Sequence, residues 1–223
     1  MIYDPSLTAA PSRKENIPGF IYWAFSCTLL APLLYVCGAS ALTVNVVCFC
    51  ANFLGAVLCF RKFTLVNIRC ALDRLFPTVY YAVLGYLGSQ VLGNLLVALL
   101  PDFSNVNDGN VASLLLEAPA LMSVSTVILA PIAEEIFYRG MIWRSLYDRN
   151  KILAYGLTMA VFAAAHVTGY IGIYPIQTLA LCFLQYLPAG YCLCWCYRRS
   201  GNLLSPILMH MIVNATGIYA MMR

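Results

Sequence analysis

The sequence predicts an all-α fold, a multi-pass transmembrane bundle of about seven helices. Of the 223 residues, 62% are hydrophobic and only 10% are charged, and the mean hydropathy is +0.80. A soluble domain is about 45–50% apolar and about 25% charged, so this composition excludes the soluble class. The length suits a single membrane domain without a separate soluble domain. The net charge of +4 is modest and gives no sign of a nucleic-acid surface.

Apolar runs of spanning length indicate where the helices lie, because about 20 apolar residues cross a bilayer. Before the first run, residues 1–18 contain three prolines and adjacent charges, and they are interpreted as a cytoplasmic N-terminal tail. Residues 19–223 then form one transmembrane domain, with N-terminal helices in 19–110 and a four-helix core in 111–223. Seven runs are predicted to span: 20–37, 41–60, 76–100, 119–143, 152–170, 175–197 and 203–222.

The distribution of Lys and Arg supports this count and predicts an orientation. Twelve of the 13 basic residues fall on one side of the predicted bundle, and only Arg223 falls on the other. Cytoplasmic loops carry excess Lys and Arg, so the N-terminus is expected in the cytoplasm and the C-terminus outside. Segment 61–74 alternates basic and apolar residues, which predicts a helix lying along the cytoplasmic surface.

Four ionisable residues stand out because they fall inside predicted spans. Glu134 and Glu135 lie in the fourth span, and His166 and His210, the only two histidines, lie in the fifth and seventh. A carboxylate in a span costs at least about 2.5–3.5 kcal/mol, so such residues indicate a functional site. Counted from the nearest basic residue at about 1.5 Å per residue, Glu134, His210 and His166 lie about 15, 16 and 22 Å deep. All three can therefore reach the middle of the bilayer.

The spacing around the two glutamates predicts different roles for them. Glu135 and Arg139 share a helix face at i,i+4, which suits a buried ion pair. Glu134 projects about 100° away and is free for chemistry. Pro131 has no N–H and leaves the carbonyl of Val127 without its helical donor, so the fourth span is expected to bend just before the glutamates.

Two further i,i+4 pairs place polar groups on common faces: Phe162 with His166, and His210 with Asn214. Each of these groups has a structural interpretation, since an ion pair or a histidine bonded across helices stabilises a bundle. A carboxylate, two imidazoles and an amide at compatible depths would need three separate structural explanations. The combination favours a functional site.

These residues, in this order and spacing, resemble the three motifs of the CPBP intramembrane proteases, also called the Abi or CAAX-protease family. The resemblance covers the core from about residue 119 to 222. It implies an intramembrane endopeptidase, and the family includes prenyl-protein CAAX endopeptidases and proteins associated with bacteriocin immunity. The motif residues are Glu134, Glu135 and Arg139, then Phe162 and His166, then His210 and Asn214.

Peptide hydrolysis needs an activated water, a stabiliser for the oxyanion and a proton donor for the amine. Glu134 is expected to act as the general base, with His166 holding the water. His210 and Asn214, one turn apart, are expected to form the oxyanion hole. Arg139, paired with Glu135, would fix the helix that carries Glu134. These roles match what the resemblance implies.

Three alternatives remain open at this stage. Glu134, His166 and His210 also make the two-histidine, one-carboxylate set of a catalytic zinc site, although a metal-free mechanism without cofactor is favoured. The same residues would suit a non-catalytic transporter or binding scaffold that relays protons or holds a ligand. A third interpretation is an immunity or chaperone-like membrane partner that keeps the site without using it.

The expected partners are membrane lipids and a membrane-associated protein or peptide substrate, prenylated or bacteriocin-related, cleaved from the cytoplasmic side. No nucleic acid is expected. The compact chain and the breadth of the resembled family point to a bacterial cytoplasmic membrane. The oligomeric state stays open.

Overall fold

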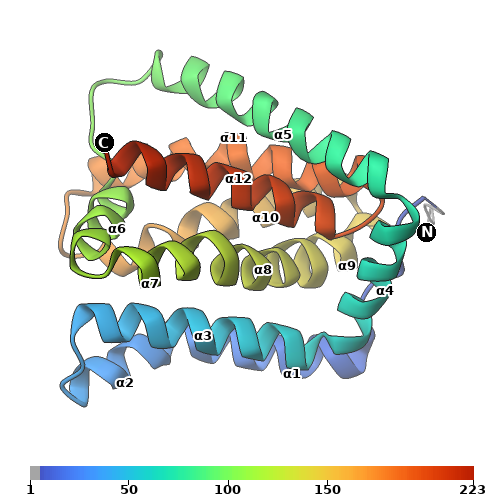
Figure 1. The fold of residues 1–223 in the computed structure, drawn as a ribbon, viewed down its shortest axis with the longest axis horizontal. Helices are drawn as coiled ribbons and strands as arrows, with labels where there is room; N and C mark the ends of the chain where they lie inside the picture. Colours follow the sequence, from blue (N-terminus) through green and yellow to red (C-terminus); the bar gives the residue numbers. More distant parts are fainter. Residues whose placement is uncertain (1–5) are drawn as a thin grey trace.

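The structure is a computed structural model that describes residues 6–223 as a bundle of helices lying side by side (Figure 1). It contains no strand within these residues, which confirms the all-helical class. Two of the named elements have only three residues each: the helix α9, and the 3₁₀ turn η4 (Thr168–Tyr170), which follows α10. The α-helices are α1 (Arg13–Phe25), α2 (Ala31–Val36), α3 (Ala41–Cys59), α4 (Arg61–Asp73), α5 (Leu75–Val97), α6 (Val106–Glu117), α7 (Pro119–Val124), α8 (Ala130–Glu135), α9 (Ser145–Tyr147), α10 (Lys151–Ala165), α11 (Ile176–Ser200) and α12 (Leu204–Met221).

Three π-helical segments join several of these into longer continuous helices. They are η1 (Ser26–Leu30), η2 (Ser125–Leu129) and η3 (Ile136–Arg144), and η4 is Thr168–Tyr170. The segment from α7 to α9 runs unbroken over Pro119–Tyr147, and 44% of its most apolar stretch is buried, against 11% in each of the first two spans. The helix that carries the two glutamates is therefore the central helix of the bundle.

All seven predicted spans correspond to helices, and six of them are long and apolar enough to cross a membrane. The exception is α5, which has 23 residues and is long enough, at about 1.5 Å per residue, but less apolar. Ser89, Gln90 and Asn94 lower its hydropathy. It packs against α11 and α12, so it belongs to the bundle (Figure 1). The six spans are Arg13–Val36, Ala41–Cys59, Pro119–Tyr147, Lys151–Tyr170, Ile176–Ser200 and Leu204–Met221.

The first helix begins at Arg13, inside the segment 1–18 that the sequence analysis interprets as a tail. Glu15 explains this early start, because its Oε2 accepts the N–H and the hydroxyl of Ser12 at 3.1 and 2.9 Å. Its Oε1 accepts the N–H of Phe63 at 2.8 Å, one of the first free donors of α4. One carboxylate thus holds the beginnings of two helices together. Residues 1–5 of the expected tail lie outside the described residues.

Residues just before α1 close one end of the bundle. The hydroxyl of Thr8 contacts Asn67 Oδ1 at 3.0 Å and the hydroxyl of Tyr197 at 2.9 Å. Its carbonyl accepts Arg144 Nε at 2.6 Å, and its N–H donates to the carbonyl of Gly201 at 3.1 Å. Gly201 has φ +79°, and a Cβ there would collide with the carbonyl of Ser6. We call this end, formed by Thr8, α4 and the connection between α11 and α12, the sealed end.

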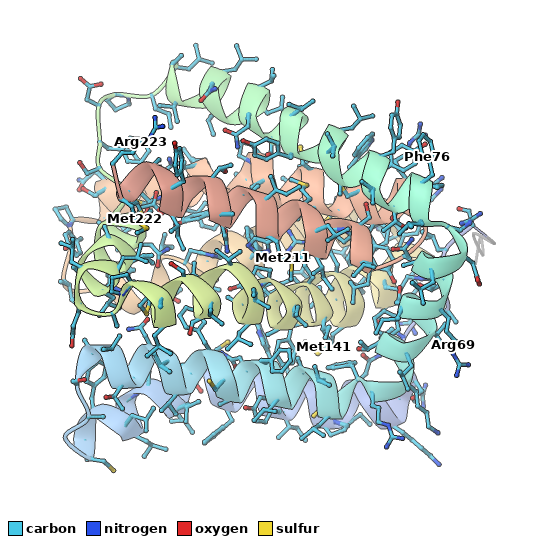
Figure 2. The ribbon with its side chains drawn as sticks, in the orientation of Figure 1. Arg69, Phe76, Met141, Met211, Met222 and Arg223 are labelled. Carbon is cyan, nitrogen blue, oxygen red and sulfur yellow. The ribbon has the colours of Figure 1, made fainter. Side chains whose placement is uncertain are left out.

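The helix predicted over 61–74 is present as α4, and it lies across the ends of the other helices (Figure 1). Figure 2 shows Arg69 on α4 at the opposite end of the molecule from Met222 and Arg223. At that opposite end lies α6, a helix that the sequence analysis treats only as a connection. Its N-cap is Asn105, whose side chain accepts the N–H groups of the second and third residues that follow.

Candidate active site

Glu135 lies at the centre of a fully buried ionic cluster. Its Oε1 accepts Arg139 Nη1 at 2.9 Å, so the i,i+4 ion pair predicted from spacing is present. The same oxygen lies 2.8 Å from His210 Nδ1. Arg139 also donates to the carbonyl of Gly190 at 3.3 Å, and its guanidinium lies 4.6 Å from the ring centre of Phe162. This cluster connects η3, α10, α11 and α12 around one buried charge pair.

Glu134, one residue earlier, has a different environment. Its side chain is 25% exposed, whereas that of Glu135 is 0% exposed. Its Oε2 lies 3.9 Å from His166 Nε2 and 4.0 Å from His210 Nε2, and it makes no hydrogen bond with any of residues 6–223. The structure therefore brings together the carboxylate and both imidazoles that the sequence singled out.

The second ring nitrogen of each histidine is held in a hydrogen bond, and this defines the role of the first. His166 Nδ1 lies 2.8 Å from the carbonyl of Phe162, which only accepts, so Nδ1 carries the proton. His210 Nδ1 lies beside Glu135 Oε1, a carboxylate oxygen that also accepts from Arg139. When a ring is neutral with its proton on Nδ1, the lone pair at Nε2 is directed toward Glu134, whereas an imidazolium donates from Nε2.

Aromatic rings fix the positions of these imidazoles. Phe162 packs against His166 with ring centres 4.7 Å apart and meets His210 edge-on at 5.8 Å. On its other side, His166 stacks on Tyr186 of α11, with centres 4.3 Å apart and an interplanar angle of 29°. His166 is the C-cap residue of α10, so it directly follows the last residue of that helix, still within the span Lys151–Tyr170. Packing on both faces compensates for this position at a helix end.

Asn214 contacts the backbone of the central helix, and Pro131 explains why. Ala130 donates to the carbonyl of Ser125, five residues earlier, because η2 has π-helical register. In that register the next carbonyl, Thr126, would need a donor from Pro131, which has no N–H. Asn214 Nδ2 donates to it at 2.8 Å instead. The carbonyl that Asn214 reaches is therefore that of Thr126, one residue before the Val127 carbonyl expected from a regular α-helix.

A cavity of about 540 Å³, with both apolar and polar side chains in its lining, adjoins Glu134 and His166 and extends to α6. Asp108, in the first turn of α6, lines it as well. Burial raises the pKa of the Asp108 carboxyl, and the nearby His166 and the Tyr186 hydroxyl partly oppose that rise. Nine further lining residues carry carboxamides: Asn45, Asn52, Gln90, Asn94, Asn105, Asn107, Asn110, Gln185 and Asn214.

The position of this cavity bears on the expected side of access. Its lining runs from the middle of the bundle toward α6, away from the sealed end and its basic residues. If the basic end faces the cytoplasm, a substrate does not reach Glu134 through that end, because the contacts of Thr8 with Asn67 and Arg144 occupy it.

The zinc alternative needs three donors arranged around one point. Within residues 6–223, no group of three His, Cys, Asp or Glu side chains is arranged to hold a metal ion. Glu134 Oε2 lies 3.9 Å from His166 Nε2 and 4.0 Å from His210 Nε2. The zinc alternative stays a prediction.

Four parts of the site had no signal in the sequence. Tyr186 and the carbonyl of Gly190 lie on α11 among apolar neighbours, and Asp108 lies in a segment interpreted as a connection. The carbonyl of Thr126 becomes available only through the π register. A tyrosine or aspartate at these positions is ordinary in a loop or a span end, so composition could not distinguish them.

The fold and site define a multi-pass helical membrane protein with a cluster of Glu and His side chains inside the bundle. The family model described as type II CAAX prenyl endopeptidase, Rce1-like, matches residues 116–216, slightly less than half of the chain. That segment contains every motif residue from Glu134 to Asn214. This match confirms the family resemblance found in the motifs, and it supports peptidase activity in general. No curated protein and no solved structure matches the chain.

Proposed function

We propose that this chain hydrolyses a peptide bond of a membrane-associated substrate with a water molecule activated by Glu134 and His166, without a metal. The observation that carries the proposal is the meeting of Glu134 Oε2 with the Nε2 atoms of His166 and His210, at 3.9 and 4.0 Å, beside a cavity. These separations are too long for direct hydrogen bonds. One water can bridge two atoms at such a separation when its two hydrogen bonds, of about 2.8 Å each, form an angle of roughly 90°.

The first chemical step uses the directed lone pairs. A water between Glu134 and His166 donates one proton to each acceptor and keeps a lone pair for the substrate carbonyl. Glu134 takes a proton as the water oxygen bonds to the carbonyl carbon. When the C–N bond breaks, Glu134 returns that proton to the leaving nitrogen. Water is consumed, and the products are a carboxylic acid and an amine.

The oxyanion of the tetrahedral intermediate needs donors from the other side. His210 Nε2 donates when the ring is an imidazolium, and Glu135, 2.8 Å from its Nδ1, balances that charge. Asn214 uses one of its two amide hydrogens on the carbonyl of Thr126. Its second hydrogen remains for the substrate, and its side chain lines the cavity. This supports the proposed oxyanion role of both residues.

The proposed substrates are membrane-associated proteins or peptides, because the site lies within a bundle that has six helices suited to spanning. The similarity to CAAX prenyl endopeptidases favours a prenylated substrate, and a bacteriocin-related peptide is the alternative. The proposed location is a bacterial cytoplasmic membrane with the N-terminus in the cytoplasm. The concentration of basic residues at the sealed end supports this orientation.

The experiment that tests the mechanism separates it from zinc hydrolysis. Purified chain in lipid vesicles is analysed for metal content and for cleavage of a farnesyl-cysteine peptide, with and without chelator. We expect less than about 0.1 zinc per chain and full activity in chelator, since the proposed mechanism uses no bound metal ion. One zinc per chain, with cleavage lost on chelation and restored by zinc, would replace this mechanism with the metalloprotease. A result of no cleavage under any condition would favour the transporter or scaffold.

A further inference from the structure

One face of the His166 ring is held by its own helix, and the other face is held by α11. Its Nδ1 bonds to the carbonyl of Phe162, whose ring also packs against it, and both groups belong to α10. The ring on the other face is that of Tyr186, with centres 4.3 Å apart. Because α10 ends at Ala165, the backbone after His166 does not continue that helix. The position of His166 Nε2, 3.9 Å from Glu134 Oε2, therefore depends on where Tyr186 lies.

Asn105, the N-cap residue of α6, holds Tyr186 from a third element. Its Oδ1 accepts the Tyr186 hydroxyl at 3.3 Å, and it also accepts the backbone N–H groups of Asn107 and Asp108 at 3.0 and 3.2 Å. Its Nδ2 donates to Oε1 of Gln185, the neighbour of Tyr186, at 2.7 Å. One carboxamide thus caps α6 and bonds to two consecutive side chains of α11.

An apolar cluster joins the same three parts of the chain. Val106 and Val167 are buried in one cluster with residues of α11, and Tyr186 packs against it. These two valines directly follow Asn105 and His166 in the chain. Close-packed side chains do not shift independently, so a displacement of the beginning of α6 is expected to move Tyr186 and the chain beside His166 together.

We propose that Asn105 is a positioning residue for hydrolysis, and that it sets the position of His166 Nε2 relative to Glu134 through Tyr186. The inference rests on the proposed function, because it concerns the imidazole that holds the water. Asn105 lies outside residues 116–216, the segment that the family model matches. A misplacement of about 1 Å can lower turnover about 10²-fold, so an effect transmitted through two contacts is large enough to measure.

The test is a double-mutant cycle in the full chain, in lipid vesicles, with a farnesyl-cysteine peptide. Asn105→Ser keeps a good N-cap oxygen for α6 but removes the amide and shortens the reach to Tyr186. Tyr186→Phe keeps the ring on His166 and removes only the hydroxyl. We expect each variant to lower kcat by roughly 10–10²-fold, with KM within about threefold of that of the unaltered chain. The double variant should be at most about threefold slower than the slower single variant, because both changes break the same link.

Two matched controls make the same chemical changes away from the cavity. Asn150→Ser alters the N-cap of α10, whose side chain accepts the N–H of Leu153 at 2.9 Å. Tyr191→Phe alters another tyrosine of α11 that packs against α10, through Tyr155. Neither Asn150 nor Tyr191 lines the cavity. Both controls should leave kcat unchanged, and Asn150→Ser should shift the melting temperature about as much as Asn105→Ser does, which separates positioning from the loss of a cap.

Cleavage at the unaltered rate by Asn105→Ser or by Tyr186→Phe would overturn the inference and leave the proposed function standing. Effects that multiply in the double variant would also overturn it, because Asn105 would then act independently of Tyr186. So would an equal loss of kcat in Asn150→Ser. If Asn105→Ser does not fold, Tyr186→Phe alone decides. If the unaltered chain cleaves no peptide, the proposed function fails and the inference fails with it.

Discussion

The two ends of the bundle solve the problem of buried polar groups in opposite ways. At the sealed end the polar groups bond to one another: Asn67 Oδ1 accepts the hydroxyl of Thr8 at 3.0 Å and the N–H of Leu203 at 2.8 Å. In the cavity, Glu134 Oε2 has no hydrogen-bond partner within residues 6–223. Satisfied groups stabilise a fold, whereas an unsatisfied carboxylate costs free energy and is available for chemistry. Changes at the sealed end should therefore alter stability, and changes at the cavity should alter turnover.

The largest expected effect on stability comes from Glu135, which belongs to the buried network although it adjoins the cavity residue. Glu135→Gln leaves the charge of Arg139 uncompensated in a buried site and weakens the bond to His210. We expect the free energy of unfolding to fall by about 3–5 kcal/mol and cleavage to be lost with it. Thermal unfolding in detergent measures this.

The control for that change is Glu117→Gln, which alters an exposed carboxylate at the end of α6. It should leave the melting temperature unchanged. If the Glu135→Gln variant has the same melting temperature as the unaltered chain, the ion pair contributes nothing to stability. The assignment of a structural role to Glu135 and a chemical role to Glu134 would then be wrong.

Asn214 is expected to contribute both to turnover and to the stability of the fold. Asn214→Ala removes a proposed oxyanion donor and also the partner of the Thr126 carbonyl. We expect turnover to fall by roughly 10²–10³ and the free energy of unfolding to fall by only about 1–2 kcal/mol. Single-turnover kinetics and thermal unfolding separate the two effects.

Asn94→Ala serves as the comparison for Asn214→Ala, since Asn94 also lines the cavity but contacts neither histidine in the described hydrogen bonds. It should change turnover only slightly. A loss of turnover at Asn214 no greater than that at Asn94 would remove Asn214 from the oxyanion hole.

The smallest expected effect on turnover is at the sealed end. Asn67→Ala deprives the N–H of Leu203 and the hydroxyl of Thr8 of their acceptor. We expect the free energy of unfolding to fall by about 1–3 kcal/mol with turnover unchanged below the melting transition. Arg69→Ala, on the exposed face of the same helix, should change neither quantity. A loss of turnover in the Asn67→Ala variant, measured where that variant is fully folded, would show that the sealed end affects the chemistry at the cavity.

The sequence predicted most of the fold because apolar length and basic residues report directly on the bilayer. All seven runs became helices, and α4 begins at Arg61, the residue predicted. Their ends were harder to predict, because they depend on contacts far away in the chain. The early start of α1 depends on Glu15 bonding to Phe63, 48 residues later. No local pattern contains that information.

The candidate site was predictable where its residues are energetically costly inside a membrane span, because such residues indicate function. Glu134, His166 and His210 are costly inside a span, and the structure places them together. The partners of these groups were not predictable. The position of Asn214 depends on a π register that only the folded helix reveals, and Tyr186 is recognisable only once its ring lies on His166.

The most direct test makes the same substitution, glutamate to glutamine, at each of the two adjacent glutamates and compares the two variants. Cleavage and melting temperature are measured for Glu134→Gln beside Glu135→Gln, in the same vesicles and on the same peptide. The account predicts that Glu134→Gln abolishes cleavage and keeps the melting temperature at or above that of the unaltered chain, because the amide fills the same space but cannot accept the proton of water. Cleavage by Glu134→Gln at the rate of the unaltered chain would contradict the central role of this carboxylate.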